Sequence, residues 1–157
     1  MEKSASKKSK KVVVVVSGGF DPPHVGHVRM FKEAKALGDE LVVILNNDNW
    51  LKKKKGFIFM PEREREELLR SVKWVDRVVL TKHEPNPDDM SVNHILLEIK
   101  PDIFANGGDR NKSNIPEAPV CEAIGCKMVF NVGEGGKVQS SSWLLENYKK
   151  LTNKGSQ

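Results

Sequence analysis

Blocks of hydrophobic and polar positions along this chain predict strands and helices in alternation. The clearest strand contains five consecutive valines, Val12–Val16, followed directly by Ser17 and Gly18. A short, uninterrupted run of β-branched apolar residues is typical of a strand buried on both faces. The same reasoning predicts strands over 12–17, 41–45, 77–80, 103–106 and 127–131, and helices over 26–37, 61–72, 90–99, 116–124 and 141–151. Strands separated by helices predict an α/β fold, a single domain whose parallel sheet has helices on both faces.

The chain of 157 residues has the length of one domain, and its charge is unevenly distributed. Residues 1–11 hold five lysines and one glutamate, which is four of the five net positive charges. We therefore expect a disordered basic tail over 1–11, one folded domain over 12–151 and a flexible C-terminal tail over 152–157. Because the positive charge belongs to the tail, it is weak evidence for nucleic-acid binding, and no nucleic-acid partner is predicted.

The sequence also bounds the cellular context. It contains neither a run of the roughly 20 apolar residues needed to cross a membrane nor a signal-peptide pattern, so no membrane partner is expected. Cys121 and Cys126 have no further cysteine or histidine close by in sequence, and neither a zinc site nor a disulfide is predicted. These features favour a reducing, cytoplasmic location.

The segment after the valine strand is the most informative part of the sequence. It contains Ser17-Gly18-Gly19-Phe20-Asp21-Pro22-Pro23-His24-Val25-Gly26-His27. Ligands of open α/β sheets bind at the carboxyl ends of the strands. His24 and His27 are three residues apart where the next helix begins, beside the unpaired amides of that helix N-terminus. Such a site favours phosphate, although each element alone also fits an ordinary turn, a stiff loop or a zinc ligand.

Taken in this order, the residues Gly-x-Phe-Asp-x-x-His-x-Gly-His, from Gly18 to His27, resemble the signature of the cytidylyltransferase-like nucleotidylyltransferases. The resemblance implies a Rossmann-like nucleotide-binding fold. It also implies an enzyme that joins a nucleoside triphosphate to a phosphorylated small molecule and releases pyrophosphate. The acceptor phosphate is already anionic, so the reaction requires fixed donors for the charge at the α-phosphorus and no general base.

The resemblance assigns roles to this segment. His24 and His27 are implied to be catalytic, donating hydrogen bonds to the α- and β-phosphates, and Gly26 to leave room for the nucleotide between the two rings. The other nucleotide-binding positions implied by the motif are Gly18, Gly19, Phe20 and Asp21. Magnesium is implied by the triphosphate alone, because the chain has no metal-ligand spacing of its own and no protein metal site is predicted. A homodimer is likewise implied by the family.

Basic residues beyond the second predicted strand are similar to the family's phosphate-binding positions. Lys52 matches best among four consecutive lysines and is predicted to be catalytic, with Lys55 as an acceptor-phosphate candidate. Lys53 and Lys54 are expected to be solvated. Arg65 fits a second acceptor-phosphate position, because its planar fork can bind a pair of phosphate oxygens. The alternatives are a solvated lysine face and an intrahelical pair of Arg65 with a glutamate.

Two later segments are similar to the family's nucleotide-binding regions. Gly108 and Asp109 resemble the segment that contacts the base and ribose. Ser141 and Ser142 match a serine-rich segment that closes over the β- and γ-phosphates with hydroxyls and helix-terminal amides. Serines before an apolar periodic run are also ordinary helix N-caps.

The substrate is less determined than the family. Glycerol-phosphate and choline-phosphate cytidylyltransferases carry Arg-Thr-Glu-Gly before the final serine run, where this chain has Gly-Gly-Lys-Val at 135–138. Gly107-Gly108-Asp109 instead resembles the heptose 1-phosphate adenylyltransferase domain, while archaeal flavin-nucleotide synthases share only the amino-terminal motif well. We therefore predict transfer onto a sugar or polyol phosphate, with ATP or CTP as the donor. The alternatives are a catalytically silent, nucleotide-binding regulatory module and a nucleic-acid-binding protein that uses the basic tail.

Overall fold

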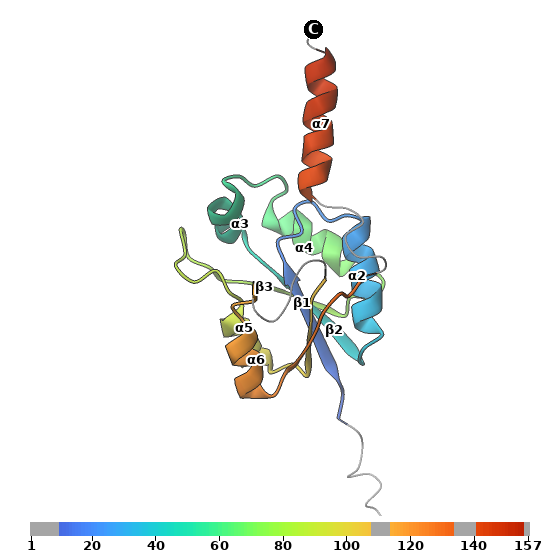
Figure 1. Ribbon diagram of the computed structural model, residues 1–157, viewed down its shortest axis with the longest axis vertical. Coiled ribbons are helices and arrows are strands. Elements are labelled where there is room, and N and C mark those ends of the chain that lie inside the picture. Colours follow the sequence, from blue (N-terminus) through green and yellow to red (C-terminus); the bar gives the residue numbers. More distant parts are fainter. Residues whose placement is uncertain (1–9, 108–113, 134–140, 156–157) are drawn as a thin grey trace, which may run out of the picture.

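The computed structural model describes residues 10–107, 114–133 and 141–155 (Figure 1). In these residues five strands form one parallel sheet in the order β3-β2-β1-β4-β5. The strands are β1 (Val13–Gly18), β2 (Glu40–Leu45), β3 (Arg77–Leu80), β4 (Ile103–Ala105) and β5 (Lys127–Val129). β1 and β2 pair from Val13 opposite Glu40 to Gly18 opposite Leu45. Their carboxyl ends therefore lie side by side, and so do the segments that follow them.

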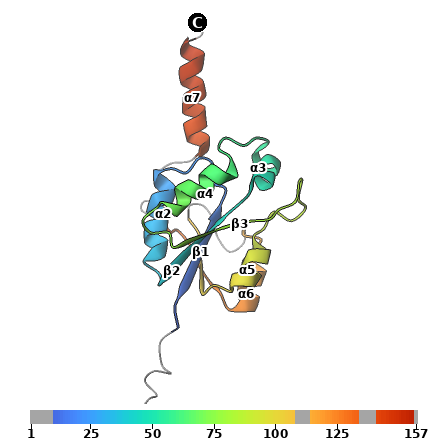
Figure 2. The same cartoon turned by 180° about the vertical axis from the view of Figure 1, so that it is seen from behind.

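Helices cover both faces of this sheet, as the two opposite views show (Figures 1 and 2). The helices are α2 (Val25–Lys35), α3 (Asp48–Lys55), α4 (Glu62–Arg70), α5 (Asn93–Ile99), α6 (Ala118–Ile124) and α7 (Ser141–Gly155). Val14 and Val16 are buried with Phe31 of α2, while Val15 is buried on the other face with residues of α5 and α6. Alternate strand residues point to opposite faces, so a run that is apolar at every position needs cover on both. The predicted Rossmann-like α/β arrangement is confirmed.

The segment after β2 differs from the prediction, because it forms a helix where a loop is expected. The side-chain oxygen of Asn47 accepts a hydrogen bond from the Trp50 N–H at 3.0 Å and caps α3. Leu51 is fully buried and anchors the helix, and Gly56 ends it in the left-handed region at φ 86°. Lysine is a good helix former, so the lysine run fits this element. The four lysines therefore project from one helix in different directions.

The C-terminal helix is longer than the sequence predicts. α7 continues to Gly155, so it includes residues 152–155 of the expected C-terminal tail. In both views α7 projects away from the sheet (Figures 1 and 2). Residues 1–9 of the expected basic tail lie outside the described residues. Within the ranges that the structure describes, no helix is long and apolar enough to cross a membrane.

Candidate functional site

The two histidines lie together at the start of α2, beyond the carboxyl end of β1. His24 is the N-cap residue: its Nδ1 accepts from the Gly26 N–H at 3.1 Å, and Nδ1 of His27 accepts from the His24 N–H at 3.2 Å. The two rings stack with centroids 3.7 Å apart and 21° between their planes. Because each Nδ1 accepts, each neutral ring carries its proton on Nε2. The helix cap therefore fixes both tautomers as the form that donates through Nε2.

The environment of His27 keeps its ring uncharged. Burial lowers the pKa of His27 to about 3, and the neighbouring His24 and Lys55 charges act in the same direction. The Phe20 and His27 rings meet edge to face, with centroids 4.7 Å apart and 87° between the planes. At neutral pH His27 is therefore a neutral, rigidly held hydrogen-bond donor.

The stacked geometry corrects one expectation about Gly26. A centroid separation of 3.7 Å is ordinary contact between rings, so no part of a nucleotide fits between His24 and His27. The Gly26 N–H instead serves the cap, by donating to His24. A phosphate can meet this pair only at the ring edges that carry Nε2.

The neighbouring glycines have a packing role within the chain itself. A Cβ on Gly18 would lie 2.9 Å from the Phe20 ring, and one on Gly19 would lie 2.9 Å from the Leu51 side chain. Phe20 has φ 47°, which turns the chain sharply after β1 and places its ring against His27. The predicted nucleotide contacts of Gly18, Gly19 and Phe20 stay predictions, but their residue types already follow from packing.

Asp21 is turned inward, which does not fit its predicted contact with nucleotide. Its side chain is 1% exposed, and its two carboxylate oxygens accept from the backbone N–H groups of Phe59 at 2.8 Å and Met60 at 2.6 Å. The peptide bond that joins Asp21 to Pro22 is cis. Asp21 therefore fastens the loop between α3 and α4 to the histidine segment.

Arg65 is also buried and hydrogen-bonded to the protein itself. This position corrects the prediction that Arg65 binds the acceptor phosphate. The residue is 0% exposed. Its guanidinium donates to the carbonyls of Met60, Gly19 and Asn46 at 2.8, 2.7 and 2.8 Å, and to the Asp48 carboxylate at 2.7 Å. These acceptors come from the ends of β1 and β2, the start of α3 and the loop before α4. Arg65 therefore holds four segments together, and its donors are directed at the protein itself.

The lysines of α3 do not follow the order expected from the sequence. Lys55 is half-buried, its Nζ lies 3.4 Å from the Asp21 carbonyl, and its charge influences His27. Burial lowers the pKa of Lys55; the nearby Asp21 opposes this shift and Arg65 reinforces it. Lys52, the predicted catalytic lysine, is exposed on the helix surface. The structure thus brings Lys55, and not Lys52, to the histidines.

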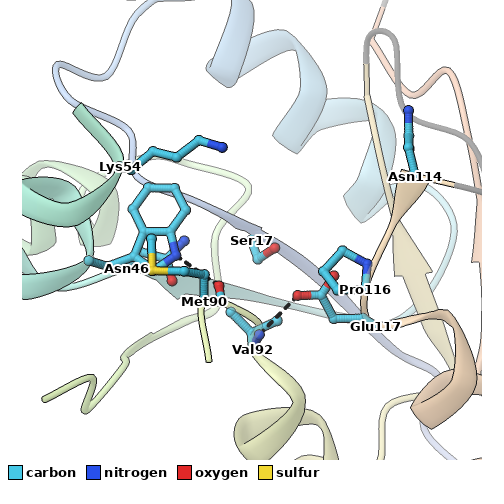
Figure 3. Close-up of a pocket in the computed structure, with 9 residues that line it drawn as sticks. Ser17, Asn46, Lys54, Met90, Val92, Asn114, Pro116 and Glu117 are labelled. Atoms are coloured by element: carbon cyan, nitrogen blue, oxygen red, sulfur yellow. Dashed lines mark hydrogen bonds between the residues drawn. The ribbon is translucent and has the colours of Figure 1, made fainter. Parts of the chain in front are cut away.

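A pocket of about 340 Å³ opens at the carboxyl edge of the sheet (Figure 3). Its lining residues are Ser17, Asn46, Trp50, Lys54, Met90, Val92, Asn114, Pro116 and Glu117. The Trp50 Nε1–H donates to the Met90 carbonyl at 2.8 Å, which fixes the indole in the wall. Sequence reasoning missed Trp50, Met90 and Glu117 as pocket residues. The only sequence signal was positional: Ser17 and Asn46 are polar residues at the ends of two buried strands.

The remaining predicted nucleotide positions stay predictions. Gly108 and Asp109 lie outside the described residues. Ser141 is the first residue of α7, and Ser142 is exposed on that helix. In the part of the chain that the structure describes, no group of three or more His, Cys, Asp or Glu side chains could hold a metal ion.

Known proteins are similar to this chain in sequence and in structure. A family model described as cytidylyltransferase-like matches residues 15–125. The chain is 42% identical to the FAD synthase of Pyrococcus horikoshii over 103 residues, 65% of this chain and 66% of that protein. It is 34% identical to the bifunctional protein HldE of Helicobacter pylori over 155 residues, 98% of this chain and 31% of that protein. The chain therefore spans about two thirds of the first relative and about a third of the second.

A solved structure agrees with these relatives. The lipopolysaccharide core biosynthesis protein from Thermoplasma volcanium is similar with a TM-score of 0.62 and 32% identity, covering 79% of this chain and 98% of that one. The match to an FAD synthase over 103 residues also shows that the expected restriction of this likeness to the amino-terminal motif is wrong. The match of the family model to most of the chain, over a parallel sheet with paired histidines at its carboxyl edge, shows that the chain belongs to the cytidylyltransferase-like family.

Proposed function

We propose that this chain is a nucleotidylyltransferase, which joins a nucleoside triphosphate to a phosphorylated small molecule. The observation that carries this proposal is the pair of stacked imidazoles at the start of α2, whose tautomers are fixed by backbone amides. Lys55 lies on the same side, and the pocket opens at the same edge of the sheet. Hydrogen-bond donors of fixed orientation, a cation and a pocket at the same edge of the sheet suit a triphosphate beside an acceptor.

The chemical step follows from these groups. An oxygen of the acceptor phosphate attacks the α-phosphorus, and a new P–O bond forms while the bond from the α-phosphorus to the bridging oxygen breaks. Pyrophosphate leaves with the electron pair of that bond. His24 and His27 would donate through Nε2 to the phosphates as charge develops on them. Since the pKa of His27 is about 3, that ring donates as a neutral group over the physiological range.

The substrates are inferred from the relatives of this chain. We propose a sugar or polyol phosphate as the acceptor. FAD carries an adenylyl group, and both an FAD synthase and HldE are similar to this chain, so ATP is favoured over CTP as the donor. FMN, which carries a phosphorylated ribityl chain, is the acceptor that the FAD-synthase likeness supports. Gly108, Asp109, Ser141 and Ser142 remain proposed nucleotide contacts.

Magnesium and a homodimer complete the proposal. The described residues contain no carboxylate cluster, and the Asp21 carboxylate is occupied by two amides. A magnesium ion would therefore be held by the phosphate oxygens of the nucleotide. The homodimer is proposed from the family alone.

A pyrophosphate-release screen tests the function. ATP and CTP are each combined with FMN, glycerol 3-phosphate and a panel of sugar phosphates. Pyrophosphate release that depends on both substrates supports the proposal. Nucleotide binding without release for any acceptor would instead support the catalytically silent module.

A further inference from the structure

The pocket contains two buried oxygen atoms for which the described residues supply no hydrogen-bond donor. Glu117 is 4% exposed, and its Oε2 accepts from the Val92 N–H at 2.9 Å. Among the described residues, Oε1 of Glu117 has no partner, and neither has Oδ1 of Asn46, which is 3% exposed. Both residues line the pocket, from opposite sides of Ser17 (Figure 3).

These oxygens constrain what the pocket can hold. A buried acceptor that has left water and found no donor is costly, and such atoms are rare in folded proteins. A carboxylate oxygen can only accept, so the group that satisfies Glu117 must bring an O–H or N–H. An aliphatic or purely anionic ligand would leave both oxygens unsatisfied. The pocket is therefore built for a ligand that donates at this wall.

The rest of the lining narrows the chemistry further. Lys54 supplies a positive charge at the pocket, and its neighbour Lys55 lies on the side of the histidines. The fixed indole of Trp50 offers a flat apolar surface. A phosphate group near the lysines would therefore be accompanied by a carbon chain over Trp50 and hydroxyls directed at Glu117 and Asn46.

We propose that Glu117, together with Asn46, selects the acceptor by accepting hydrogen bonds from hydroxyl groups of a polyhydroxylated phosphate ester. This assignment rests on the proposed function and deepens it. Glycerol phosphate, a sugar phosphate and the phosphorylated ribityl chain of FMN share this chemistry. Glu117 is thus a specificity-determining residue of the acceptor site. Its carboxylate recognises the hydroxyl groups of the acceptor substrate and not its phosphate group.

The test removes the side-chain oxygen of Glu117 that faces the pocket and keeps the hydrogen bond between Glu117 and the Val92 N–H. In Glu117→Gln the side-chain carbonyl can still accept from the Val92 N–H, while an NH₂ group replaces the oxygen that faces the pocket. Glu98→Gln is the matched control, because it makes the same change of charge at an exposed position of α5 outside the pocket. Each protein is assayed with acceptor pairs that differ only in hydroxyls: glycerol 3-phosphate with n-propyl phosphate, a hexose 1-phosphate with its 2-deoxy form, and FMN with its hydroxyl-free phosphopentyl analogue.

The parent protein is expected to prefer the hydroxylated member of its acceptor pair by about 10- to 100-fold in kcat/KM, the range for hydrogen bonds to a charged group. Glu117→Gln reduces this preference to about 3-fold or less, through KM for the acceptor, and leaves KM for ATP unchanged. Glu98→Gln behaves as the parent. The pair that shows the effect identifies the source of the polyol, whether flavin, sugar or glycerol. Equal losses with both members of a pair, or an unchanged preference in Glu117→Gln, would overturn the inference.

Failure of the inference can be distinguished from failure of the proposed function. If no combination releases pyrophosphate, the function is wrong, and binding is then followed by saturation-transfer NMR with the same acceptor pairs. Binding of the hydroxylated members to the parent, and its loss in Glu117→Gln, would still support the assignment. Absence of binding by every hydroxylated phosphate ester would overturn it.

Discussion

Two buried charged residues, one on each side of the site, differ in how completely the chain supplies their hydrogen-bond partners. On the side of the histidines, Arg65 is completely buried and its guanidinium meets three carbonyls and one carboxylate of the chain itself. On the side of α6, Glu117 is almost as buried, but only one of its two oxygens has a partner among the described residues. The chain itself satisfies the buried charge of Arg65 in full, whereas Glu117 keeps one oxygen without a partner among the described residues, and Glu117 lines the pocket.

Removing the charge of Arg65 is expected to have the largest effect on the protein. Arg65→Met is expected to lower the free energy of unfolding by about 3–5 kcal/mol, because it leaves the buried acceptors and Asp48 without their donor. Urea denaturation measures the loss. Arg70→Met is the control on the same helix, since its pair with Glu66 at 2.6 Å is exposed and worth about 0.5 kcal/mol or less. A loss for Arg65→Met no larger than for the control would show that Arg65 is not structural.

The histidine variants should affect turnover and leave stability nearly unchanged. His24→Asn keeps a good N-cap, and His27→Gln keeps a side chain that can accept from the N-cap amide, so both preserve the cap while removing Nε2. We expect turnover to fall by about 10²-fold or more, as for the loss of a donor that stabilises developing charge. Steady-state kinetics and thermal unfolding are measured together. Full turnover in either purified, folded variant would contradict the catalytic role.

The low pKa of His27 also predicts how stability depends on pH. The folded-state pKa is about 3 and the unfolded value is 6.5, so between these values the unfolded chain binds a proton that the folded chain does not. Stability from this group is therefore fully present above pH 6.5 and is lost as pH falls toward 3. Between pH 7 and pH 5 the parent should lose about 1–2 kcal/mol more than His27→Gln. Parallel pH profiles of the two proteins would contradict the burial of a neutral ring.

The sequence was sufficient for the architecture because the architecture depends on local pattern. The valine run requires cover on both faces, and the motif that follows it places the histidines at a helix start; both were predicted correctly. Strand and helix order followed from the same patterns. Helix α3 was missed because its capping by Asn47 and its burial through Leu51 depend on one side chain each and not on a periodic face.

Roles that depend on distant contacts could not be predicted in the same way. The acceptors of Arg65 include Gly19, 46 residues away, and the donors to Asp21 lie 38 and 39 residues away. A charged residue in a motif looks the same in sequence whether it faces a ligand or the interior. Glu117 had no signal at all, because its importance lies in an oxygen that the described residues leave unpaired.

The smallest expected effects concern the lysines of α3, for which the sequence and the structure point to different catalytic residues. The sequence predicts that Lys52 is catalytic, whereas the structure leaves Lys52 exposed and brings Lys55 to Asp21 and the histidines. Lys55→Ala should lower kcat/KM for ATP by about 10-fold, because a partly desolvated charge loses little to screening. Lys52→Ala should change it by about 2-fold or less, as is usual for an exposed charge. Kinetics of the two variants at low and at high salt decide between the assignments. A larger loss in Lys52→Ala would return the catalytic role to Lys52 and would mean that α3 turns when the nucleotide binds.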